Sequence, residues 1–410
     1  MLPKEDNDLL THTGAGNPMG DLFRRYWIPA VLSEEIPVPD CPPVQVKLLG
    51  EELVAFRDSR GRVGLLDEHC SHRGTSLFYG RNEECGLRCI YHGWKYDVDG
   101  NVLETPAEPP GSDFRNKIHH KAYPCKEVAG IVFAYMGPRE EMPLFPNYEW
   151  VSMSPEHLFV SKVFLDCNWL QGLEGDCDSS HLSYLHRSLG GDRQTFENQG
   201  YAADGAPNLE AVDTDYGVRM ISLRKTGPDS NLFRVTNFVM PCQGFIPGGL
   251  QGMTVHYWVP IDDTHLWKYY IVCNRDRPLR EEERTLGKDL DQEFKKLRNL
   301  QNNYGMDREA QKTKTFIGVG PSFFIHDACA TETMGPIYDR SREHLAASDE
   351  TVIAIRKFLL KAVKSFQAGE EPPHIVRGAA SNSFRHLVTI SEQLPASVSP
   401  EERLAQKIAE

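Results

Sequence analysis

The chain has 410 residues, of which 40% are hydrophobic and 25% are charged, a composition that is ordinary for a globular protein of two or three domains. Its 58 acidic and 45 basic residues give a net charge of −13, which argues against nucleic acid or an anionic membrane as the main partner. Because no run of 18 apolar residues is present, the first ten residues carry charges in place of a signal peptide's apolar core, and ten cysteines are too few for a disulfide framework, we expect a cytoplasmic protein that does not associate with membranes.

Residues 1–40 are predicted to form a mostly helical N-terminal segment. The apolar residues that stand at helical spacing are Leu22, Phe23, Tyr26 and Trp27. Residues 41–145 have a different texture, because short β-like runs such as VQVKLLG and GIVFAYMG alternate with turns rich in Gly, Asp and Asn. This second segment is therefore predicted to be an all-β domain.

The stretch GPREEMPLFPNYEW predicts a domain boundary near residue 145, and residues 146–410 mix helix and strand patterns. Strands are expected between residues 210 and 275, in runs such as MTVHYWVP and LWKYYIVC. The expected helices cover residues 168–187, 281–300 and 349–367, the last with Ser348 as its N-cap. The second domain is therefore predicted to be α+β, with an antiparallel sheet flanked by helices.

Two stretches of the β domain each carry one cysteine and one histidine. HCSHRG holds Cys70 and His72, and CIYHGWKY holds Cys89 and His92. Zinc takes the same ligand types, so a structural zinc site is one interpretation. Zinc fingers, however, pair two cysteines in one half and two histidines in the other, whereas each half here is mixed. A mixed set suits a Rieske [2Fe–2S] centre, in which two thiolates hold one iron and two imidazoles hold the other.

The neighbours of these two stretches are expected to support such a centre. Gly74 and Gly93 would let the backbone approach bridging sulfides closely and donate N–H bonds to them. Trp94 and Tyr96 are expected to shield one side of the cluster. Cys85, the nearest spare thiol, is expected to be a bystander.

A second group of candidate ligands lies within NWLQGLEGDCDSSHLSYLHRS, residues 168–188, where Asp178, His181 and His186 follow one another. On an ideal helix the two histidines diverge by about 140°, which is too far for one metal. Either they are ordinary polar residues, or the helix unwinds near LSYL. Non-haem Fe(II) oxygenases use two histidines and one carboxylate, leaving positions open for O2 and substrate.

The stretches CSHRG and CIYHGWKYDVDG, followed by Asp-x2-His-x4-His, resemble the signatures of Rieske non-haem iron oxygenases. The likeness is greatest to the oxygenase α subunits of the phthalate dioxygenase-like group. It extends beyond the ligand motifs to LTHTGAGNPMGDLFRRYWIP, DREAQKTKTFIGVG and ETMGPIYDRSREHLAASD. The resemblance implies a Rieske domain over residues 41–145 and a catalytic domain of the helix-grip type over residues 146–410.

The same resemblance implies the ligands of both metal centres. Cys70, His72, Cys89 and His92 would hold the [2Fe–2S] cluster. His181 and His186 would hold a mononuclear Fe(II), with Asp327 in FFIHDACATETMGP as the third ligand. Glu332 is the competing carboxylate, and His326 is expected to pack beside the site or to support a ligand. The motif leaves Glu174 without a catalytic role, because some ring dioxygenases carry an asparagine near that place.

The implied activity is the reductive use of O2 as co-substrate, with electrons from NADH delivered by a separate flavin and iron–sulfur reductase. Asp178 would link the cluster of one subunit to the mononuclear iron of the next, within a homotrimer or a multiple of it. The acidic surface could dock a basic patch on the reductase.

The expected substrate is a small aromatic compound, carboxylated as in many relatives, hydroxylated by cis-dihydroxylation or by monooxygenation. An aryl-ether O-demethylase of the same family is the alternative, and an electron carrier without oxygenase activity is a more remote one. A carboxylated substrate calls for a basic residue near the iron, and Arg219, Arg224 and Arg234 are the candidates. Further residues that could line the substrate site, although each could equally belong to the core, are Met220, Phe238, Met240 and His256 or Tyr257.

Overall fold

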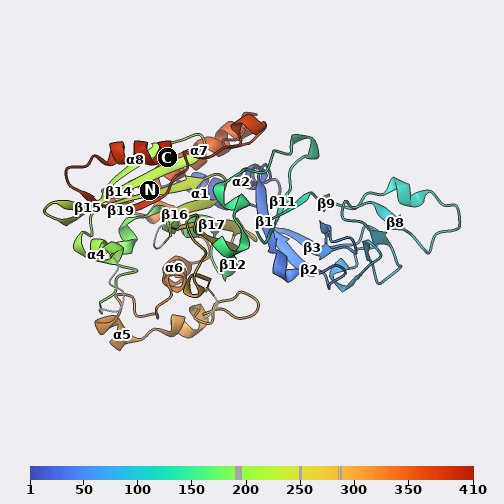
Figure 1. The fold of residues 1–410 in the computed structure, drawn as a ribbon. Coiled ribbons are helices and arrows are strands. Elements are labelled where there is room, and N and C mark those ends of the chain that lie inside the picture. Colours follow the sequence, from blue (N-terminus) through green and yellow to red (C-terminus); the bar gives the residue numbers. More distant parts are fainter. Residues whose placement is uncertain (190–195, 249–251, 285, 287–288) are drawn as a thin grey trace. The chain divides into compact units, whose positions relative to one another are not determined.

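The computed structural model describes residues 1–189, 196–248, 252–284, 286 and 289–410, and the chain divides into two compact units (Figure 1). One unit comprises residues 13–145, and the other comprises residues 1–12 together with residues 146–410. The predicted N-terminal segment 1–40 is therefore split between the two units.

The unit of residues 13–145 is built from short antiparallel strands. Its elements are α2 (Pro18–Phe23), β1 (Trp27–Leu32), β2 (Val44–Leu48), β3 (Glu51–Arg57), β4 (Val63–Asp67), β5 (Arg81–Glu83), β6 (Gly86–Arg88), β7 (Lys95–Tyr96), β8 (Val102–Glu104), β9 (Ala122–Tyr123), β10 (Cys125–Val128) and β11 (Ile131–Tyr135). They form three sheets, in the orders β1-β11-β10, β2-β3-β4-β9 and β5-β6-β7-β8. The prediction of a helix that includes Trp27 was wrong, because this residue begins strand β1, which pairs with β11.

The core of this unit joins two of its sheets. Val54, Phe56 and Leu66 of the second sheet pack with Leu87 and Tyr96 of the third, and all five are fully buried. Cys70 and Cys89 belong to the same apolar cluster. The two stretches that carry the candidate cluster ligands are thus anchored in the core.

The second unit is organised around one large antiparallel sheet, as predicted. Its elements are α1 (Lys4–Thr11), β12 (Leu158–Leu165), α3 (Trp169–Cys177), α4 (Phe196–Ala203), β13 (Asn208–Asp213), β14 (Gly217–Gly227), β15 (Ser230–Val239), β16 (Gln243–Pro247), β17 (Met253–Pro260), β18 (Leu266–Cys273), α5 (Arg308–Thr313), α6 (Phe323–Glu332), α7 (Glu350–Gln367), β19 (Ile390–Pro395) and α8 (Pro400–Ala409). The strand order is β12-β18-β17-β16-β15-β14-β13, with β19 beside β15.

Helices cover both faces of this sheet (Figure 1). On one face, Phe233 and Val235 of β15 pack with β19 and with Leu404 of α8. On the other face, Phe238 meets Phe358 of α7, with ring centroids 6.2 Å apart, and α3 lies over β16 and β17. The face that α3 covers carries the candidate site.

The helix predictions for residues 281–300 and 349–367 need correction. Among the described residues between 281 and 300 there is a short 3-10 turn, Glu281–Arg284, but no α-helix. The Asp291 carboxylate accepts the backbone N–H groups of Glu293 and Lys295 (2.8 and 2.9 Å), and the chain turns so that Lys296 reaches a buried carboxylate. The helix predicted over 349–367 begins at Glu350, with Asp349 and not Ser348 as its N-cap.

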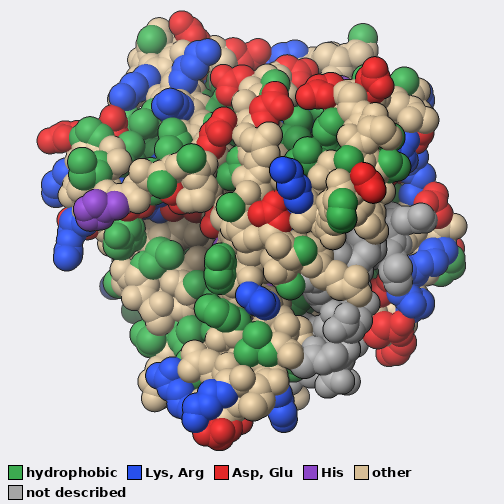
Figure 2. Space-filling view, turned by 90° about the vertical axis from the view of Figure 1, so that its left-hand side faces the viewer, with side chains coloured by type: hydrophobic (Ala, Val, Ile, Leu, Met, Phe, Trp, Pro, Cys, Tyr) green, Lys and Arg blue, Asp and Glu red, His purple; other side chains and the backbone are tan. Residues whose placement is uncertain are grey.

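The charged side chains are mixed in sign on the face drawn in Figure 2, where basic and acidic groups stand beside apolar ones. Within the described part of the chain, no helix combines the length and the apolar character that a membrane span requires.

Candidate metal sites

The two Cys–His stretches repeat one backbone arrangement. The N–H of Gly74 donates to the carbonyl of Cys70 (2.8 Å), and the N–H of Gly93 donates to that of Cys89 (3.1 Å). Both glycines adopt positive φ values, +75° and +74°, which other residues rarely adopt. At Gly93 a side chain would also strike Pro106, because a Cβ would lie 2.7 Å from its Cγ. Two equal tight turns therefore present the four candidate ligands.

The four ligand side chains separate into a buried pair and an outer pair. Cys70 and Cys89 are each 3% exposed, whereas His72 is exposed and His92 is half-buried. The two imidazole rings lie 4.6 Å apart, and His72 stacks on Trp94 at 4.7 Å. Burial raises the pKa of the Cys89 thiol, and the neighbouring Cys70 adds to this rise. The site thus has two buried thiols on its inner side and two more exposed imidazoles on its outer side. A Rieske cluster requires such a set, with two sulfur ligands for one iron and two nitrogen ligands for the other.

Two other residues near these turns can be placed. The Tyr96 hydroxyl lies 3.0 Å from the Cys70 sulfur, where it can donate a hydrogen bond to a thiolate. Cys85 stands at the turn between β5 and β6 with a φ of 62°. It is a free, partly buried thiol.

The second site depends on where α3 ends. The predicted helix 168–187 stops at Cys177, and Asp178 already has an extended conformation (φ −98°, ψ 106°). A short 3-10 turn, Ser180–Ser183, follows. The helix therefore ends before LSYL. His181 and His186 do not lie on one continuous helix, so the 140° between them on an ideal helix does not apply. The rings of His181 and His186 lie 5.0 Å apart.

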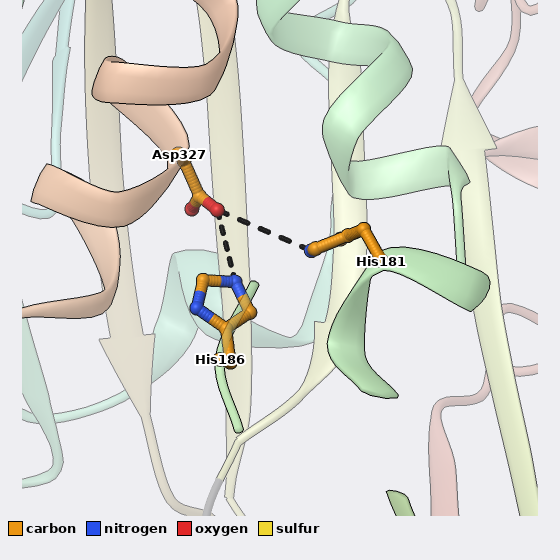
Figure 3. A group of neighbouring side chains, drawn as sticks. All are labelled: His181, His186 and Asp327. Carbon is orange, nitrogen blue, oxygen red and sulfur yellow. Dashed lines mark ion pairs between the residues drawn. The ribbon is translucent and has the colours of Figure 1, made fainter. Parts of the chain in front are cut away.

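Asp327 of α6 completes a compact group with the two histidines (Figure 3). Its Oδ1 lies 2.9 Å from Nε2 of His186 and 4.0 Å from Nε2 of His181. One ligand atom from each of the three residues lies within 4.8 Å of the other two. Two imidazole nitrogens and one carboxylate oxygen thus converge on one point.

The hydrogen bonds of His326 fix the proton on His186. Nε2 of His326 lies 2.8 Å from the carbonyl of Gly320, an acceptor only, so this nitrogen carries a hydrogen. In neutral His326, Nδ1 is then an acceptor, and Nδ1 of His186 donates to it over 3.2 Å. The lone pair of His186 Nε2 consequently faces the Asp327 carboxylate. With this tautomer a nitrogen lone pair and a carboxylate oxygen lie 2.9 Å apart and face the same point, so the residues present fit a metal ion.

His181 has a matching arrangement with Asp178. Nδ1 of His181 is buried without a hydrogen-bond partner among the described residues. Oδ2 of Asp178 lies 3.8 Å from this nitrogen, while Oδ1 of the same carboxylate accepts the N–H of Ser180 (2.7 Å). The turn after α3 thus holds a carboxylate beside the outer nitrogen of this imidazole.

The electrostatics of the group also suit a divalent cation. Burial alone would raise the pKa of Asp327, but His186, Lys268 and His181 hold that pKa far below its usual range. Burial, together with the nearby His186, lowers the pKa of His181. The site therefore offers an ionised carboxylate and, at His181, a neutral imidazole.

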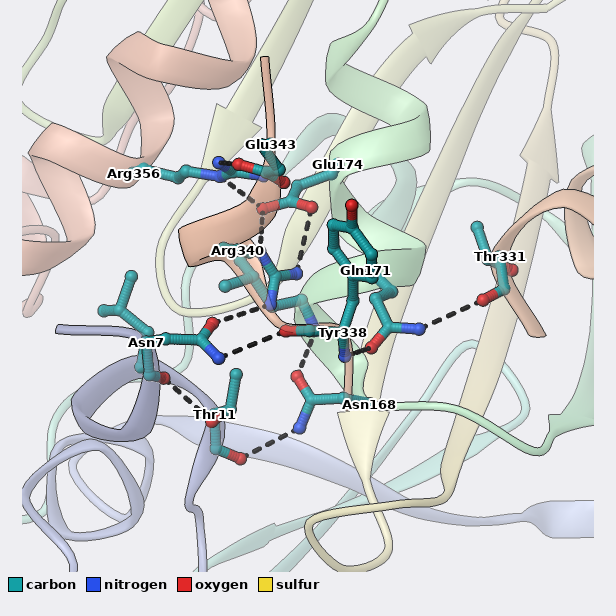
Figure 4. A network of polar contacts seen from close by, with 12 residues as sticks. Asn7, Thr11, Asn168, Gln171, Glu174, Thr331, Tyr338, Arg340, Glu343 and Arg356 are labelled. Atoms are coloured by element: carbon teal, nitrogen blue, oxygen red, sulfur yellow. Dashed lines mark hydrogen bonds and ion pairs between the residues drawn. The ribbon is translucent and has the colours of Figure 1, made fainter. Parts of the chain in front are cut away.

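The competing acids are occupied elsewhere. Glu332 forms a buried ion pair with Lys296 (2.7 Å), accepts the backbone N–H of Asp166 (3.0 Å) and bonds the Tyr304 hydroxyl. Glu174 forms ion pairs with Arg340 (2.9 Å) and Arg356 (2.6 Å) in a buried network (Figure 4). Asp327, and not Glu332, lies next to the two histidines.

The arginine candidates are mostly engaged by the protein itself. Arg219 donates to the carbonyl of His386 (2.7 Å), and Arg234 donates to the Tyr201 hydroxyl (3.2 Å). Arg224 is fully buried and donates to the hydroxyl and the carbonyl of Ser179. Of these three arginines, Arg224 and Arg234 lie on the same sheet face as Met220, which is the face that α3 covers.

His256 lies on the sheet face that α3 covers, bonded to Asp176, whereas Tyr257 points to the opposite face. Phe238 and Met240 are fully buried. The sequence predictions did not include Lys268 and Asp176, which lie beside His256. The signal for Lys268 was a charged residue in the middle of the apolar strand LWKYYIVC.

Comparison with known proteins identifies both units. Residues 26–124 match the Rieske [2Fe-2S] domain family, and residues 134–392 match the LigXa C-terminal domain-like family. The oxygenase subunit of phthalate 4,5-dioxygenase from Pseudomonas putida is 42% identical over 387 residues, which are 90% of this chain and 88% of that protein. The oxygenase subunit of 3-chlorobenzoate-3,4-dioxygenase from Comamonas testosteroni is 36% identical, with 92% of each chain covered.

A third relative, the 5,5'-dehydrodivanillate O-demethylase oxygenase subunit of Sphingobium sp., is 30% identical over 95% of this chain and 87% of its own. Two solved structures share the fold. NdmA of Pseudomonas putida CBB5 has a TM-score of 0.59 at 19% identity, over 86% of this chain and 94% of its own. A carbazole 1,9a-dioxygenase oxygenase in complex with ferredoxin has a TM-score of 0.57 at 20% identity, over 91% and 100%.

The two domain types and the shared identity define a class of oxidoreductases that incorporate O2. Within that class, this chain belongs to the phthalate dioxygenase-like Rieske non-haem iron oxygenases, as an oxygenase subunit.

Proposed function

We propose that this protein is the terminal oxygenase of a multicomponent system that hydroxylates a carboxylated aromatic compound. One observation carries the proposal: two imidazole nitrogens and one carboxylate oxygen, from His181, His186 and Asp327, lie within 4.8 Å of one another. This is the ligand set of non-haem iron oxygenases that keep coordination positions open.

In this proposal Cys70, His72, Cys89 and His92 hold the Rieske cluster, and His181, His186 and Asp327 hold Fe(II). Once bound, the cluster supplies single electrons and the mononuclear iron supplies reductive activation of O2. The chain's own residues prepare both sites. His326 keeps the proton of His186 on Nδ1, and the charge of Lys268 helps to keep Asp327 ionised. Trp94, stacked on His72, shields one side of the cluster site.

The relatives favour an aromatic carboxylate, because two of their names contain phthalate and chlorobenzoate. Cis-dihydroxylation and monooxygenation are both compatible with the site. O-demethylation is the second candidate, since a third relative is an O-demethylase. Product mass separates these reactions, because dihydroxylation adds two hydroxyl groups and demethylation removes CH2.

The electrons are proposed to come from NADH through a separate flavin and iron–sulfur reductase. The carbazole oxygenase that shares this fold was solved with a ferredoxin, which supports a separate electron-transfer partner. We also propose a homotrimer or a multiple of it, in which Asp178 joins the cluster of one subunit to His181 of the next. A cytoplasmic location fits these partners.

The decisive experiment combines metal analysis with turnover. A red-brown protein with about three irons per chain is expected, two in the cluster and one mononuclear. With a surrogate reductase, NADH-dependent O2 uptake should yield a hydroxylated aromatic carboxylate. About two irons per chain and no product would indicate a Rieske electron carrier, and a colourless zinc protein would exclude both interpretations.

Replacement of Asp178 should separate metal binding from electron delivery. Asp178→Asn keeps the side-chain shape, but the amide no longer carries the charge that faces His181 Nδ1. We expect full iron content and a fall of product formation of roughly 100-fold, within the range for removal of a group that orients a metal ligand. Single-turnover reoxidation of the reduced cluster, followed by absorbance, measures the step. Unchanged reoxidation would contradict the role of Asp178.

Removal of the Tyr96 hydroxyl should change the cluster without changing the mononuclear site. A donor to the Cys70 sulfur stabilises the reduced, more negative cluster. Tyr96→Phe should therefore lower the reduction potential, by roughly 40 mV if the bond contributes about 1 kcal/mol more in the reduced state. Protein-film voltammetry measures this shift, and Tyr91→Phe, at an exposed ring in the same stretch, is the control.

A further inference from the structure

The sheet face that α3 covers carries a polar cluster outside both metal sites. On β17 and β18, His256 stands opposite Tyr270, and Trp258 stands opposite Lys268, so the four side chains share one face. Asp176, in the last turn of α3, accepts hydrogen bonds from His256 Nδ1 (2.8 Å) and Trp258 Nε1 (2.6 Å). We call Lys268 and Tyr270 the donor cluster.

Asp176 is seated closely against the sheet because residue 244 is a glycine. A Cβ at Gly244 would lie 2.3 Å from Oδ2 of Asp176. Burial would raise the pKa of Asp176, but His256 and Lys268 hold it below its usual value. The carboxylate is therefore ionised, and it holds Nδ1 of His256 as a donor, which leaves Nε2 of the neutral ring as an acceptor.

The donor cluster is buried, and neither its ammonium, which lies over the Trp258 ring (4.2 Å to the centroid), nor its phenol has a hydrogen-bond acceptor among the described residues. Lys268 is 2% exposed, and within the described chain its ammonium makes no hydrogen bond, with the nearest Asp176 oxygen 4.0 Å away. The Tyr270 hydroxyl is buried without a hydrogen-bond partner among the described residues. Unsatisfied buried donors cost about 1–3 kcal/mol each, and more when charged. Such a cost is expected where a ligand supplies the missing acceptors.

The cluster lies close to the candidate iron site. Asp176 precedes Asp178 by two residues and His181 by five, along the last turn of α3 and the turn after it. The charge of Asp327 also reaches the cluster. Burial lowers the pKa of Lys268 while Asp176 and Asp327 act against this, and burial with Asp327 raises the pKa of Tyr270. A group bound here would hold the rest of its molecule near the metal-binding carboxylate.

We propose that Lys268 and Tyr270 bind the anionic group of the substrate, an aromatic carboxylate. This inference rests on the proposed function and names the residues that would select its substrate. The ammonium would give a charge-assisted hydrogen bond to one carboxylate oxygen, and the phenol would donate to the carboxylate as well. A neutral isostere would leave a buried ammonium unpaired, so the cluster discriminates by charge. The sequence analysis expected this basic residue to be Arg219, Arg224 or Arg234. In this proposal it is Lys268 of β18.

The test is equilibrium binding by calorimetry, with benzoate and phthalate as anionic probes and benzamide as the neutral probe. Lys268→Met removes the charge and keeps most of the volume. We expect at least a tenfold weaker affinity for benzoate and phthalate, and less than a twofold change for benzamide. Tyr270→Phe should weaken benzoate binding about threefold, and it serves if the Met variant does not fold.

The chain offers a matched control on the opposite face of the same sheet. Lys162 of β12 is 3% exposed, with its ammonium 4.3 Å from the ring centroid of Trp267. Lys162→Met should leave binding of all three probes within twofold of the wild type, because this lysine points away from α3.

Equal losses for benzoate and benzamide in Lys268→Met, or wild-type benzoate affinity in both cluster variants, would overturn the inference. So would a wild-type protein that binds neither anion more tightly than benzamide. Iron content of the same preparations keeps the two proposals apart. About three irons per chain without charge-selective binding rejects only the donor cluster, whereas about two irons rejects the oxygenase site.

Discussion

Asp327→Ala is expected to lose the mononuclear iron and all product formation while the protein stays red-brown. Removing a group that merely supports a metal ligand typically costs 10–100-fold in metal affinity, and loss of a direct ligand should cost more. The iron content should fall from about three to about two per chain. Elemental analysis and the visible spectrum of the cluster measure the two centres separately.

The matched control for this change is the carboxylate five residues further along α6. Glu332→Gln should keep about three irons per chain, because Glu332 bonds Lys296, Tyr304 and the backbone of Asp166, away from the histidines. It should instead lower stability, since the buried Lys296 loses its counter-charge. Glu309→Gln, at an exposed position of α5, controls for the loss of one charge. Retention of the third iron by Asp327→Ala would contradict the proposed ligand set.

Glu174→Gln is expected to produce the largest loss of stability. Glu174 joins two buried arginines, Arg340 and Arg356, and Arg340 also bonds Asn7 of α1 (3.0 Å; Figure 4). Breaking a buried pair by removing one partner typically costs about 3–5 kcal/mol, because the remaining charge stays buried. Urea denaturation followed by circular dichroism should show this loss. Asp8→Asn, at an exposed pair with Lys4 on α1, should cost less than about 1 kcal/mol.

The pH dependence of this effect has a definite sign. Burial favours protonation of Glu174, but Arg340 and Arg356 outweigh it and lower the pKa below its ordinary 4.5. A carboxyl group whose pKa is depressed by folding stabilises the protein above its unfolded pKa, and the contribution disappears as the pH falls through the folded value. The difference between wild type and Glu174→Gln should therefore be constant near neutrality and shrink below pH 4.5. A difference that grows in acid would contradict the network.

The β framework was predictable because its strands carry their own local signal. VQVKLLG and LWKYYIVC become β2 and β18, where alternation and β-branched residues agree with the tertiary environment. The Rieske unit followed from its two mixed Cys–His stretches, whose ligand set chemistry restricts strongly, whereas the catalytic unit followed from the family resemblance. The end of α3 at Cys177 did not follow from the sequence, since no Gly or Pro follows it. Contacts from β14, such as Arg224 on Ser179, hold the turn that follows.

The failed helix over 281–300 has a similar cause. Its leucines have helical spacing, but Leu297 is 53% exposed and Phe294 has a φ of 60°, so they form no buried stripe. Within this segment the ammonium of Lys296 pairs with Glu332 of α6, which is distant in sequence. Likewise, the donor cluster of β18 lies against Asp176 of α3 and Trp258 of β17, and sequence spacing cannot predict that these residues meet. Periodicity reports local preference only, and long-range ion pairs override it.

The path of the backbone through the two units has a practical consequence. Thr11 and Leu10 accept hydrogen bonds from Asn168 (2.9 Å) and Trp169 (3.1 Å), so residues 1–12 are fastened to the unit that ends the chain. Residues 13–145 are consequently an insertion, covalently attached at two points. Exchange of this insertion between related enzymes must respect two junctions, near residues 12 and 145. A chimera joined only near residue 145 would place the α1 of one enzyme on the second unit of the other. That helix would then lack the residues that anchor it in its own protein.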